Sequence, residues 1–415
     1  MEEWKEYKVE DIYSVQNGYA FRSGDFYDDY VEPSYEVLKI GHIEIGGGMR
    51  QSPKRSYVDR LPKYKRWVLQ KGDIVMGMTD MKNNIQILGV PAMVERSDHY
   101  VLNQRVGRLT IKDSNSFDND FFYFQMRSMS FLDELRKKAN SGVQVNLTTE
   151  AIKTTSLFAP SFDKQKQIGK ILRCLEDKIE LNNRINHNLE EQAQALFKSW
   201  FVDFEPFKQE QFVNTEMGLI PKDWSIVPFF DIVRLCSGGT PKTDQPDYWG
   251  GNIPFFTPKD VSSSPFCLKT EKYITKTGLD HCNSHLYEPF TTFITARGTV
   301  GKLCMTGYPM AMNQTNYAIC SINIDPILAF LFSKQIVNNL KNKANGAVFD
   351  AITTRDFEGE RVIMAPDSIL SEFSSTIRPL YNQILENEKQ SFALSKTREL
   401  VLPALMTGQT INHNC

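Results

Sequence analysis

The sequence predicts an α+β protein in which two similar, mixed α/β units are joined by two long antiparallel coiled-coil helices, arranged as a pseudo-twofold internal repeat. Two observations predict this fold. A series of residues in the first half of the 415-residue chain recurs in the same order in the second half. In each half, a β-rich segment is followed by a long segment with heptad spacing. A chain of this length also exceeds one ordinary domain.

The internal repeat runs through both the β-rich and the heptad segments. Matching positions keep their order and nearly keep their spacing, among them Trp4 and Trp224, Gly18 and Gly238, Asn103-Gln104 and Asn313-Gln314, and the ranges 120–149 and 325–354. Chance could supply one such pair but not an ordered series. The pattern therefore indicates a duplication of about half the chain, not a solenoid of short repeats.

Each β-rich segment, 1–160 and 208–366, is predicted to form one globular domain. Short apolar runs such as 73–76 and 292–295 are bounded by Gly, Pro and Asn residues, as β-strands commonly are. Apolar residues at helical spacing predict one helix near the end of each domain, over 120–139 and 325–344.

The remaining segments, 161–207 and 367–415, are predicted to be long spacer helices. Each follows an Ala-Pro pair and has an early aspartate that can cap its first turn. Apolar residues recur every fourth and then every third position, and the middle of each seam is polar. The seam includes Leu175, Ile179, Asn182 and Leu189 in the first helix and Leu380, Ile384, Asn387 and Leu394 in the second.

Neither apolar stripe is expected to stay exposed, so each helix is the natural partner of the other. Because the halves are duplicates, a pseudo-twofold axis would make the helices antiparallel, with Asn182 and Asn387 near the crossing. Pro379 and Pro403 predict local kinks in the second helix. The alternative is two separate amphipathic helices, each lying on its own domain.

Composition and charge exclude several classes of protein. With 48 Lys and Arg against 50 Asp and Glu, the net charge of −2 excludes a polycation that coats nucleic acid, but not a protein with one basic face. No segment is apolar over the length that a bilayer requires, and the N-terminus lacks the features of a signal peptide. Seven scattered cysteines favour a reducing compartment. A cytoplasmic protein without membrane contact is therefore expected.

The residues predict no catalytic constellation and no metal site. The Gly-Thr-Val-Gly-Lys segment at 298–302 has the wrong spacing for a phosphate-binding loop. The cluster His281-Cys282-Asn283-Ser284-His285 could attract zinc but has no accompanying Cys-x-x-Cys pair. Glu176-Asp177-Lys178 resembles the end of a nuclease motif, but its place on a predicted helix favours a solvated face. The chain is expected not to be an enzyme by itself.

Two similar domains on a helical spacer suit a protein that reads two separated places on duplex DNA. Residues able to contact bases or phosphates are concentrated in loops of both domains. In the first domain they are Arg22, Lys54, Arg55, Lys65, Arg66, Lys82, Asn83, Asn84 and Arg105. In the second they are Lys242, Thr243, Lys259, Arg297, Lys302 and Gln314. The alternative for any one of them is an ordinary solvated surface position.

Apolar residues gather where the first spacer helix ends. The residues are Trp200, Phe201, Phe204 and Phe207. If they are exposed beyond the two-helix seam, as their positions suggest, they predict an interface with a partner protein.

Several motifs resemble those of a known family, the DNA-specificity subunits of type I restriction–modification systems. The resemblance covers nearly the whole chain and is most specific in the helical stretches 160–207 and 366–409. Within the domains it rests on Asn17-Gly18-Tyr19-Ala20-Phe21, Ser237-Gly238-Gly239-Thr240-Pro241, Tyr248-Trp249, Ala296-Arg297-Gly298-Thr299-Val300-Gly301 and the two Asn-Gln pairs. The first domain departs from the Arg-Gly pattern, with Met76-Gly77-Met78-Thr79 in its place.

The resemblance implies a division of labour with other proteins. Each globular unit would be a target recognition domain that reads one half of an asymmetric, bipartite DNA site with a nonspecific gap. The helices would space the domains and dock two modification (methyltransferase) subunits, which use S-adenosylmethionine to methylate adenine. Restriction/translocase subunits driven by ATP, with magnesium, would translocate and cleave unmethylated DNA. The chain itself would bind no cofactor, and all catalysis would reside in the partners.

Two alternatives remain at this point. One is a specificity-like subunit of another phage-defence methylation system, which would bind DNA but have different partners. The other is a coiled-coil adaptor whose globular ends bind proteins. The concentration of Asn, Gln, Arg and Lys in the loops of both units argues against the adaptor.

Overall fold

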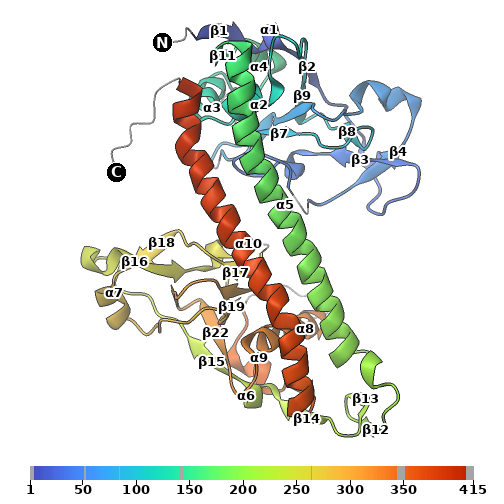
Figure 1. The fold of residues 1–415 in the computed structure, drawn as a ribbon, viewed down its shortest axis with the longest axis vertical. Helices are drawn as coiled ribbons and strands as arrows, with labels where there is room; N and C mark the ends of the chain where they lie inside the picture. Colours follow the sequence, from blue (N-terminus) through green and yellow to red (C-terminus); the bar gives the residue numbers. More distant parts are fainter. Residues whose placement is uncertain are drawn as a thin grey trace. The chain divides into compact units, whose positions relative to one another are not determined.

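A computed structural model describes residues 4–50, 53–83, 85–140, 142, 144–262, 264–343 and 351–407 (Figure 1). The chain divides into two compact units. Unit 1 contains Met1–Ile179 and Ala393–Cys415, and unit 2 contains Glu180–Phe392. Each unit therefore consists of one globular domain with part of each of the two long helices.

Unit 1 is built on two antiparallel or mixed sheets. The larger sheet has the order β2 (Tyr13–Asn17), β9 (Val106–Ile111), β5 (Ile74–Gly77) and β7 (Pro91–Met93). The smaller sheet has the order β4 (Tyr57–Asp59), β3 (Ser34–Leu38) and β8 (Tyr100–Leu102). Two strand pairs complete the unit, β1 (Lys5–Lys8) with β11 (Ser156–Ala159) and β6 (Thr79–Met81) with β10 (Gln144–Asn146).

Unit 1 also contains short helices and 3₁₀ turns, and its α-helices contribute to the core of the larger sheet. They are α1 (Val9–Ile12), α2 (Asn119–Met126), α3 (Met129–Lys137), α4 (Thr149–Lys153) and the 3₁₀ turns η1 (Ser23–Asp25), η2 (Ile40–His42) and η3 (Pro62–Trp67). The prediction of a single helix over 120–139 is wrong. The structure has two helices there because Ser128 interrupts the first and caps the second, its side chain accepting from the Phe131 N–H.

Unit 2 repeats this plan with a five-stranded sheet. Its order is β15 (Val233–Ser237), β22 (Asn316–Ser321), β19 (Thr292–Thr295), β20 (Leu303–Thr306) and β17 (Phe266–Cys267). A smaller sheet contains β18 (Lys272–Ile274), β16 (Trp249–Phe256) and β21 (Ala311–Met312). The pairs are β14 (Ser225–Pro228) with β23 (Arg361–Met364) and β12 (Phe212–Thr215) with β13 (Gly218–Pro221).

Unit 2 contains a helix at the position predicted for 325–344. α8 (Pro326–Lys343) begins one residue after the predicted start at 325, and residue 344 lies outside the described ranges. The other short helices are α6 (Phe229–Ile232), α7 (Lys276–Asp280), α9 (Thr354–Glu358), η4 (Glu205–Phe207), η5 (Pro246–Tyr248) and η6 (Pro258–Asp260). In both larger sheets, the strand that comes first along the chain pairs with the strand that comes last, β2 with β9 and β15 with β22. Each smaller sheet contains one parallel pair. The sequence repeat is thus a repeat of strand topology.

The long helices are α5 (Phe162–Phe201) and α10 (Asp367–Thr407), and each continues through both units. In unit 1, Ile168 and Leu172 near the start of α5 belong to the same core as Met406 near the end of α10. In unit 2, Phe197 near the end of α5 shares a core with Phe373 near the start of α10. The helix segments are therefore antiparallel within each unit, and the predicted fold class is confirmed.

The predicted seam positions are buried or half-buried along both helices. Asn182, Ile384 and Asn387 are buried, and Leu175, Ile179, Leu189, Leu380 and Leu394 are half-buried. Pro379 and Pro403 both lie inside α10, which remains one helix. Among the described helices, none combines the length and apolar character needed to cross a membrane.

Candidate nucleic-acid interface

In unit 2, the predicted DNA-contacting residues lie in loops that leave one edge of the larger sheet. Ser237 at the end of β15 is opposite Tyr317, and Thr295 at the end of β19 is opposite Asn316. Because neighbouring strands are antiparallel, the end of β15, the start of β22 and the end of β19 meet at this edge. The loops that continue from it carry Lys242, Thr243, Arg297, Lys302 and Gln314. We call this edge the loop edge of unit 2.

The smaller sheet contributes to the same edge. β16 runs parallel to β21, with Phe256 opposite Met312, and the Asn313 N–H donates to the Phe256 carbonyl at 3.0 Å. The turn after β16, which carries Lys259, is consequently placed beside the Asn313 loop. Lys259 is well exposed, and its Nζ lies 4.0 Å from Glu271.

Two adjacent glycines allow the loops to approach this closely. A Cβ on Gly238 would lie 2.1 Å from the Asn313 carbonyl oxygen, and a Cβ on Gly239 would lie 2.5 Å from the Asn283 nitrogen. Any side chain at either position would displace backbone, so the Gly-Gly pair is required by the packing of three loops. The equivalent contact in unit 1 is Gly18 against Asn103, where a Cβ would lie 2.0 Å from the carbonyl oxygen.

The Asn-Gln pair of unit 2 holds the loops together through its side chains. Asn313 Oδ1 accepts from the Thr315 N–H at 3.1 Å, the Thr315 hydroxyl at 2.8 Å and Asn316 Nδ2 at 2.5 Å. The Thr240 hydroxyl donates to Gln314 Oε1. The side-chain oxygens of both residues are therefore occupied within the chain.

Unit 1 presents an equivalent loop edge. Asn17 is opposite Gly107, and Gly77 is opposite Val106, so the end of β2, the start of β9 and the end of β5 converge. The loops beyond them carry Arg22, Lys82, Asn83 and Arg105, all exposed. Asn84 lies outside the described residues.

The loop that carries Lys82 and Asn83 is organised by one carboxylate. Asp80 accepts from the backbone N–H groups of Met81, Gln86, Ile87 and Leu88 at 2.6–3.2 Å. Partial burial opposes ionisation of Asp80, but these four donors outweigh it and lower its pKa. The backbone on both sides of Lys82 and Asn83 is thus held by an ionised side chain.

Lys54 and Arg55 lie in the segment that leads into β4 of the smaller sheet of unit 1. Arg55 Nε lies 3.7 Å from Oε1 of the buried Glu36, which also receives His42 Nε2 at 3.0 Å. Lys39 is absent from the residues that the sequence predicts. It follows β3 directly, next to the point at which the Asn103 N–H donates to the Leu38 carbonyl at 3.1 Å. Burial and the nearby positive charge of Lys54 contribute to a lowered pKa for Lys39. Lys65 and Arg66 are exposed on η3.

Most of these cations lack an internal counter-charge. Every predicted contact residue within the described ranges is exposed. Within those ranges, the ion pairs of this group are Arg55 with Glu36 and Lys259 with Glu271, both at 3.7 Å or longer. Exposed cations that hold no carboxylate are available to an external anion such as phosphate.

The aromatic residues at the end of α5 were expected to be exposed, and this expectation is wrong. Phe201, Phe204 and Phe207 are 2%, 8% and 8% exposed. The chain reverses at Phe204, whose φ of 53° is left-handed, and the rings fold back onto Trp224 and Phe373. They form part of the core of unit 2, while Trp200 is half-buried. Because these three rings are buried, they give no support to an interface with a partner protein.

The prediction that Glu176 lies on a solvated face is also wrong. Its Oε1 lies 3.0 Å from Arg127 of the domain, and its Oε2 pairs with Arg398 of α10. Burial alone would raise the pKa of Glu176, but the two guanidinium groups lower it below the ordinary value. The residue is a structural link between the domain of unit 1 and both long helices.

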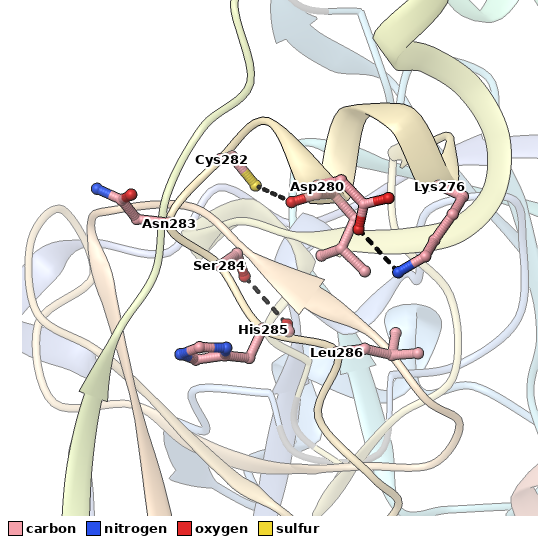
Figure 2. Close-up of a pocket in the computed structure, with 8 residues that line it drawn as sticks. Lys276, Asp280, Cys282, Asn283, Ser284, His285 and Leu286 are labelled. Carbon is pink, nitrogen blue, oxygen red and sulfur yellow. Dashed lines mark hydrogen bonds and ion pairs between the residues drawn. The ribbon is translucent and has the colours of Figure 1, made fainter.

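Residues 282–286 line a pocket of about 560 Å³ together with Lys276, Leu279 and Asp280 of α7 (Figure 2). His281 Nδ1 bonds to the Thr277 carbonyl at 2.8 Å, and its ring stacks on Tyr248. Across the described ranges, no group of three or more His, Cys, Asp or Glu residues is placed to hold a metal ion.

Comparisons with known proteins agree on one family. Residues 1–191 and 221–392 match the family described as "Type I restriction modification DNA specificity domain". The chain is 24% identical to the type I restriction enzyme HindI specificity subunit of Haemophilus influenzae, over 99% of this chain and 100% of that protein. It is 28% identical to the type I restriction enzyme MjaIX specificity subunit of Methanocaldococcus jannaschii, over 70% and 69% of the two chains.

A solved structure supports the same fold. The type I restriction–modification S subunit from M. genitalium superposes with a TM-score of 0.61 at 13% identity, covering 98% of this chain and 96% of that one. Since two copies of the family's domain together span most of the sequence, the chain belongs to the family of type I restriction–modification DNA specificity subunits.

Proposed function

We propose that each unit reads one half of an asymmetric, bipartite DNA site, and that the helix pair sets the length of the nonspecific gap. The observation that carries this proposal is the loop edge found in both units. In each, loops bearing exposed Arg, Lys, Asn and Gln residues leave the same edge of an equivalent sheet. Duplicated scaffolds with different loops suit two half-sites of different sequence.

The electrostatics of the loop edges fit a duplex. Lys242, Arg297 and Lys302 in unit 2 have no ion-pair partner among the described residues. Some of these cations would contact phosphates and fix the position of the domain, while others would contact base edges and give specificity. A chain of net charge −2 binds DNA in this scheme through local basic loops, not through its overall charge.

Partner subunits would supply the chemistry. We propose that the chain assembles with two modification subunits, which bind S-adenosylmethionine and methylate adenine, and with restriction/translocase subunits that use ATP and magnesium. The relatives named above are subunits of type I restriction enzymes, which supports this assembly. The long helices are the natural scaffold for it, because each continues through both units.

Exchange of one domain tests the proposal. The first domain, residues 1–160, is replaced by that of a relative, and methylated adenines are mapped across the genome of cells that carry the modification subunit. One half of the methylated motif should change and the other should remain. A hybrid that alters both halves together, or a native chain that yields no bipartite motif, would overturn the two-reader proposal.

A further inference from the structure

We propose that Asn283 and His285 are specificity-determining residues of unit 2, reading base edges in one half-site. The inference rests on the proposed function and extends it to a segment, 281–286, that belongs to neither the Gly-Gly motif nor the Asn-Gln motif. The sequence offers this segment as a candidate for zinc, and its neighbours in the fold assign it a different role.

The segment is fixed to the loop edge by backbone pairing. Tyr287 and Met310 exchange both backbone hydrogen bonds, at 2.9 and 3.1 Å. The Met312 N–H donates to the Ser284 hydroxyl at 3.0 Å. Segment 283–287 thus runs antiparallel to 310–312, and this direction places Asn283 next to the Asn313 loop, from which β22 begins.

Gly239 fixes the same position independently. A Cβ on Gly239 would lie 2.5 Å from the nitrogen and 3.0 Å from the Cβ of Asn283. The base of the Asn283 side chain is therefore packed against the loop that carries Lys242 and Thr243. Two separate contacts, that of Ser284 with Met312 and that of Asn283 with Gly239, place Asn283 among the cationic loops.

The segment has buried side chains that anchor it and exposed polar side chains that project from it. Ser284 and Tyr287 are each 5% exposed, whereas Asn283 and His285 are exposed. Figure 2 shows Asn283 and His285 projecting to one side of the segment, while Leu286 and Lys276 lie on the other. Because the two polar side chains project to the same side, they can contact one surface together.

Asn283 and His285 also differ from the Asn-Gln pair in their bonding. Asn313 Oδ1 accepts three hydrogen bonds within the chain, and Gln314 accepts one. Among the described residues, the Asn283 amide and the His285 ring nitrogens have no hydrogen-bond partner, and the contact of His285 is an edge contact with Tyr287. An unoccupied amide on a preorganised backbone can bind adenine through its N6 and N7 atoms, and an imidazole can donate to or accept from a base edge.

The corresponding place in unit 1 is filled differently. There the connection from β4 to β5 carries η3, with Lys65 and Arg66 exposed and Trp67 Nε1 donating to the Asn17 carbonyl at 3.1 Å. The scaffold is repeated, but Asn283 and His285 in unit 2 take the place of a turn with Lys65 and Arg66 in unit 1. Such a difference is expected where two domains read different bases.

The test uses the full-length chain with its modification subunit and compares Asn283→Ala and His285→Ala with the native protein. Asn214→Ala is the matched control, an exposed asparagine of unit 2 on β12, outside the loop edge. The native motif is first found from the methylated adenines. Binding to duplexes with single base-pair changes in that motif is then measured at fixed salt.

In Asn283→Ala and in His285→Ala, the preference for the native base pair over other base pairs should fall by about 5- to 150-fold at one or two adjacent positions of one half-site. The other half-site, the affinity for nonspecific duplex and the thermal unfolding midpoint should match those of the native chain. An unchanged pattern of discrimination in both variants overturns the inference and leaves the proposed function intact. Equal weakening on all duplexes also overturns it, because that is the behaviour of a phosphate contact. A native chain without sequence-dependent binding overturns the proposed function, and the inference with it.

Discussion

Asn387 of α10 donates from Nδ2 to Oδ1 of Asn186 on α5 at 2.8 Å, in the middle of the helix seam. One turn earlier on α5, Asn182 Nδ2 donates to the Asn387 carbonyl at 3.2 Å and to Gln390 and Ser391 at 2.9 and 3.1 Å. These contacts pair defined turns of the two helices. A buried amide in an otherwise apolar seam commonly fixes register at some cost in stability.

Replacing one member of this pair should cost more than replacing both. Asn387→Leu leaves the buried Asn186 amide without its partner, so the free energy of unfolding of unit 2 should fall by about 1–3 kcal/mol. In the double variant Asn186→Leu, Asn387→Leu the unsatisfied group is removed and part of the loss should be recovered. Asn382→Leu, at an exposed position of α10, is the control. Denaturant unfolding of the native chain, the single variants Asn186→Leu and Asn387→Leu, the double variant and the control measures the coupling, and strictly additive losses would contradict a shared hydrogen bond.

Glu176→Gln should destabilise unit 1 strongly, because Arg127 and Arg398 would keep their charges in a largely buried site. Arg127 is 5% and Arg398 14% exposed at the side chain. Removing one partner of a buried ion pair costs about 3–5 kcal/mol. Asp177→Asn, at the exposed neighbouring position, should have little effect. Urea unfolding followed in unit 1 would show the difference, and equal stability of the two variants would exclude the proposed structural link.

Glu388 makes the stability of unit 2 depend on pH near neutrality. Burial raises its pKa from 4.5 to about 7, although the Ser264 hydroxyl donates to it and opposes the rise. The folded state therefore holds a proton that the unfolded state has released between pH 4.5 and 7. Stability should fall as the pH rises through this window, by up to about 3 kcal/mol.

Glu388→Gln removes the titrating group but retains an oxygen that can accept from Ser264. The variant should gain stability relative to the native chain from pH 4.5 to 7, and the difference should then stay constant. Glu386→Gln, at the exposed position two residues earlier, is the matched control. Unfolding curves of native chain and Glu388→Gln that remain parallel across the window would show that Glu388 does not titrate there.

Arg297→Ala should weaken binding to the target duplex by about 1–3 kcal/mol if the guanidinium contacts a base through two hydrogen bonds. Arg297 is exposed at the loop edge, beside the end of β19. Arg361→Ala is the control, because Arg361 is exposed in the same unit but pairs with Glu216 at 3.1 Å. Electrophoretic titrations at a stated salt concentration compare the two, and equal affinities would remove Arg297 from the interface.

Local sequence patterns predicted the features of the fold that depend on periodicity. The heptad spacing predicted both long helices and their polar middle, and the repeat predicted two domains of the same topology. The residues around Phe204 show where such reasoning stops. An aromatic run after a helix looks exposed in sequence, and only the left-handed turn at Phe204 and the distant Trp224 bury it.

The candidate nucleic-acid interface also depends on contacts that local sequence patterns do not predict. Basic residues in loops were visible in the sequence, but the role of Asn283 depends on Gly239 and Met312, which are remote from it along the chain. Similarly, the paired Asn-Gln motifs suggested contact residues, whereas the hydrogen bonds of Asn313 stay within the loop. Motifs identify where loops meet, and tertiary contacts decide which side chains remain available to DNA.

The length of the helix pair should determine the gap between half-sites. The polar stretch between Leu181 and Asn188 is a poor place for an insertion, because it would separate Asn182 and Asn186 from their shared contact with Asn387. Insertion of one heptad after Ile179 in α5 and another after Phe392 in α10, at the borders of the two units, keeps the contacts inside each unit. Seven residues also keep the seam in phase and add roughly 10.5 Å to each helix.

At about 3.4 Å per base pair, the gap in the methylated motif should lengthen by up to three base pairs, with both half-sites unchanged. Insertions of four residues at the same two places are the control for phase. They rotate the seam, so a smaller change in the gap and lower stability are expected. Mapping methylated adenines in cells that carry each variant measures the gap directly. If the heptad variant methylates DNA with the native gap, the helices do not measure the distance between half-sites.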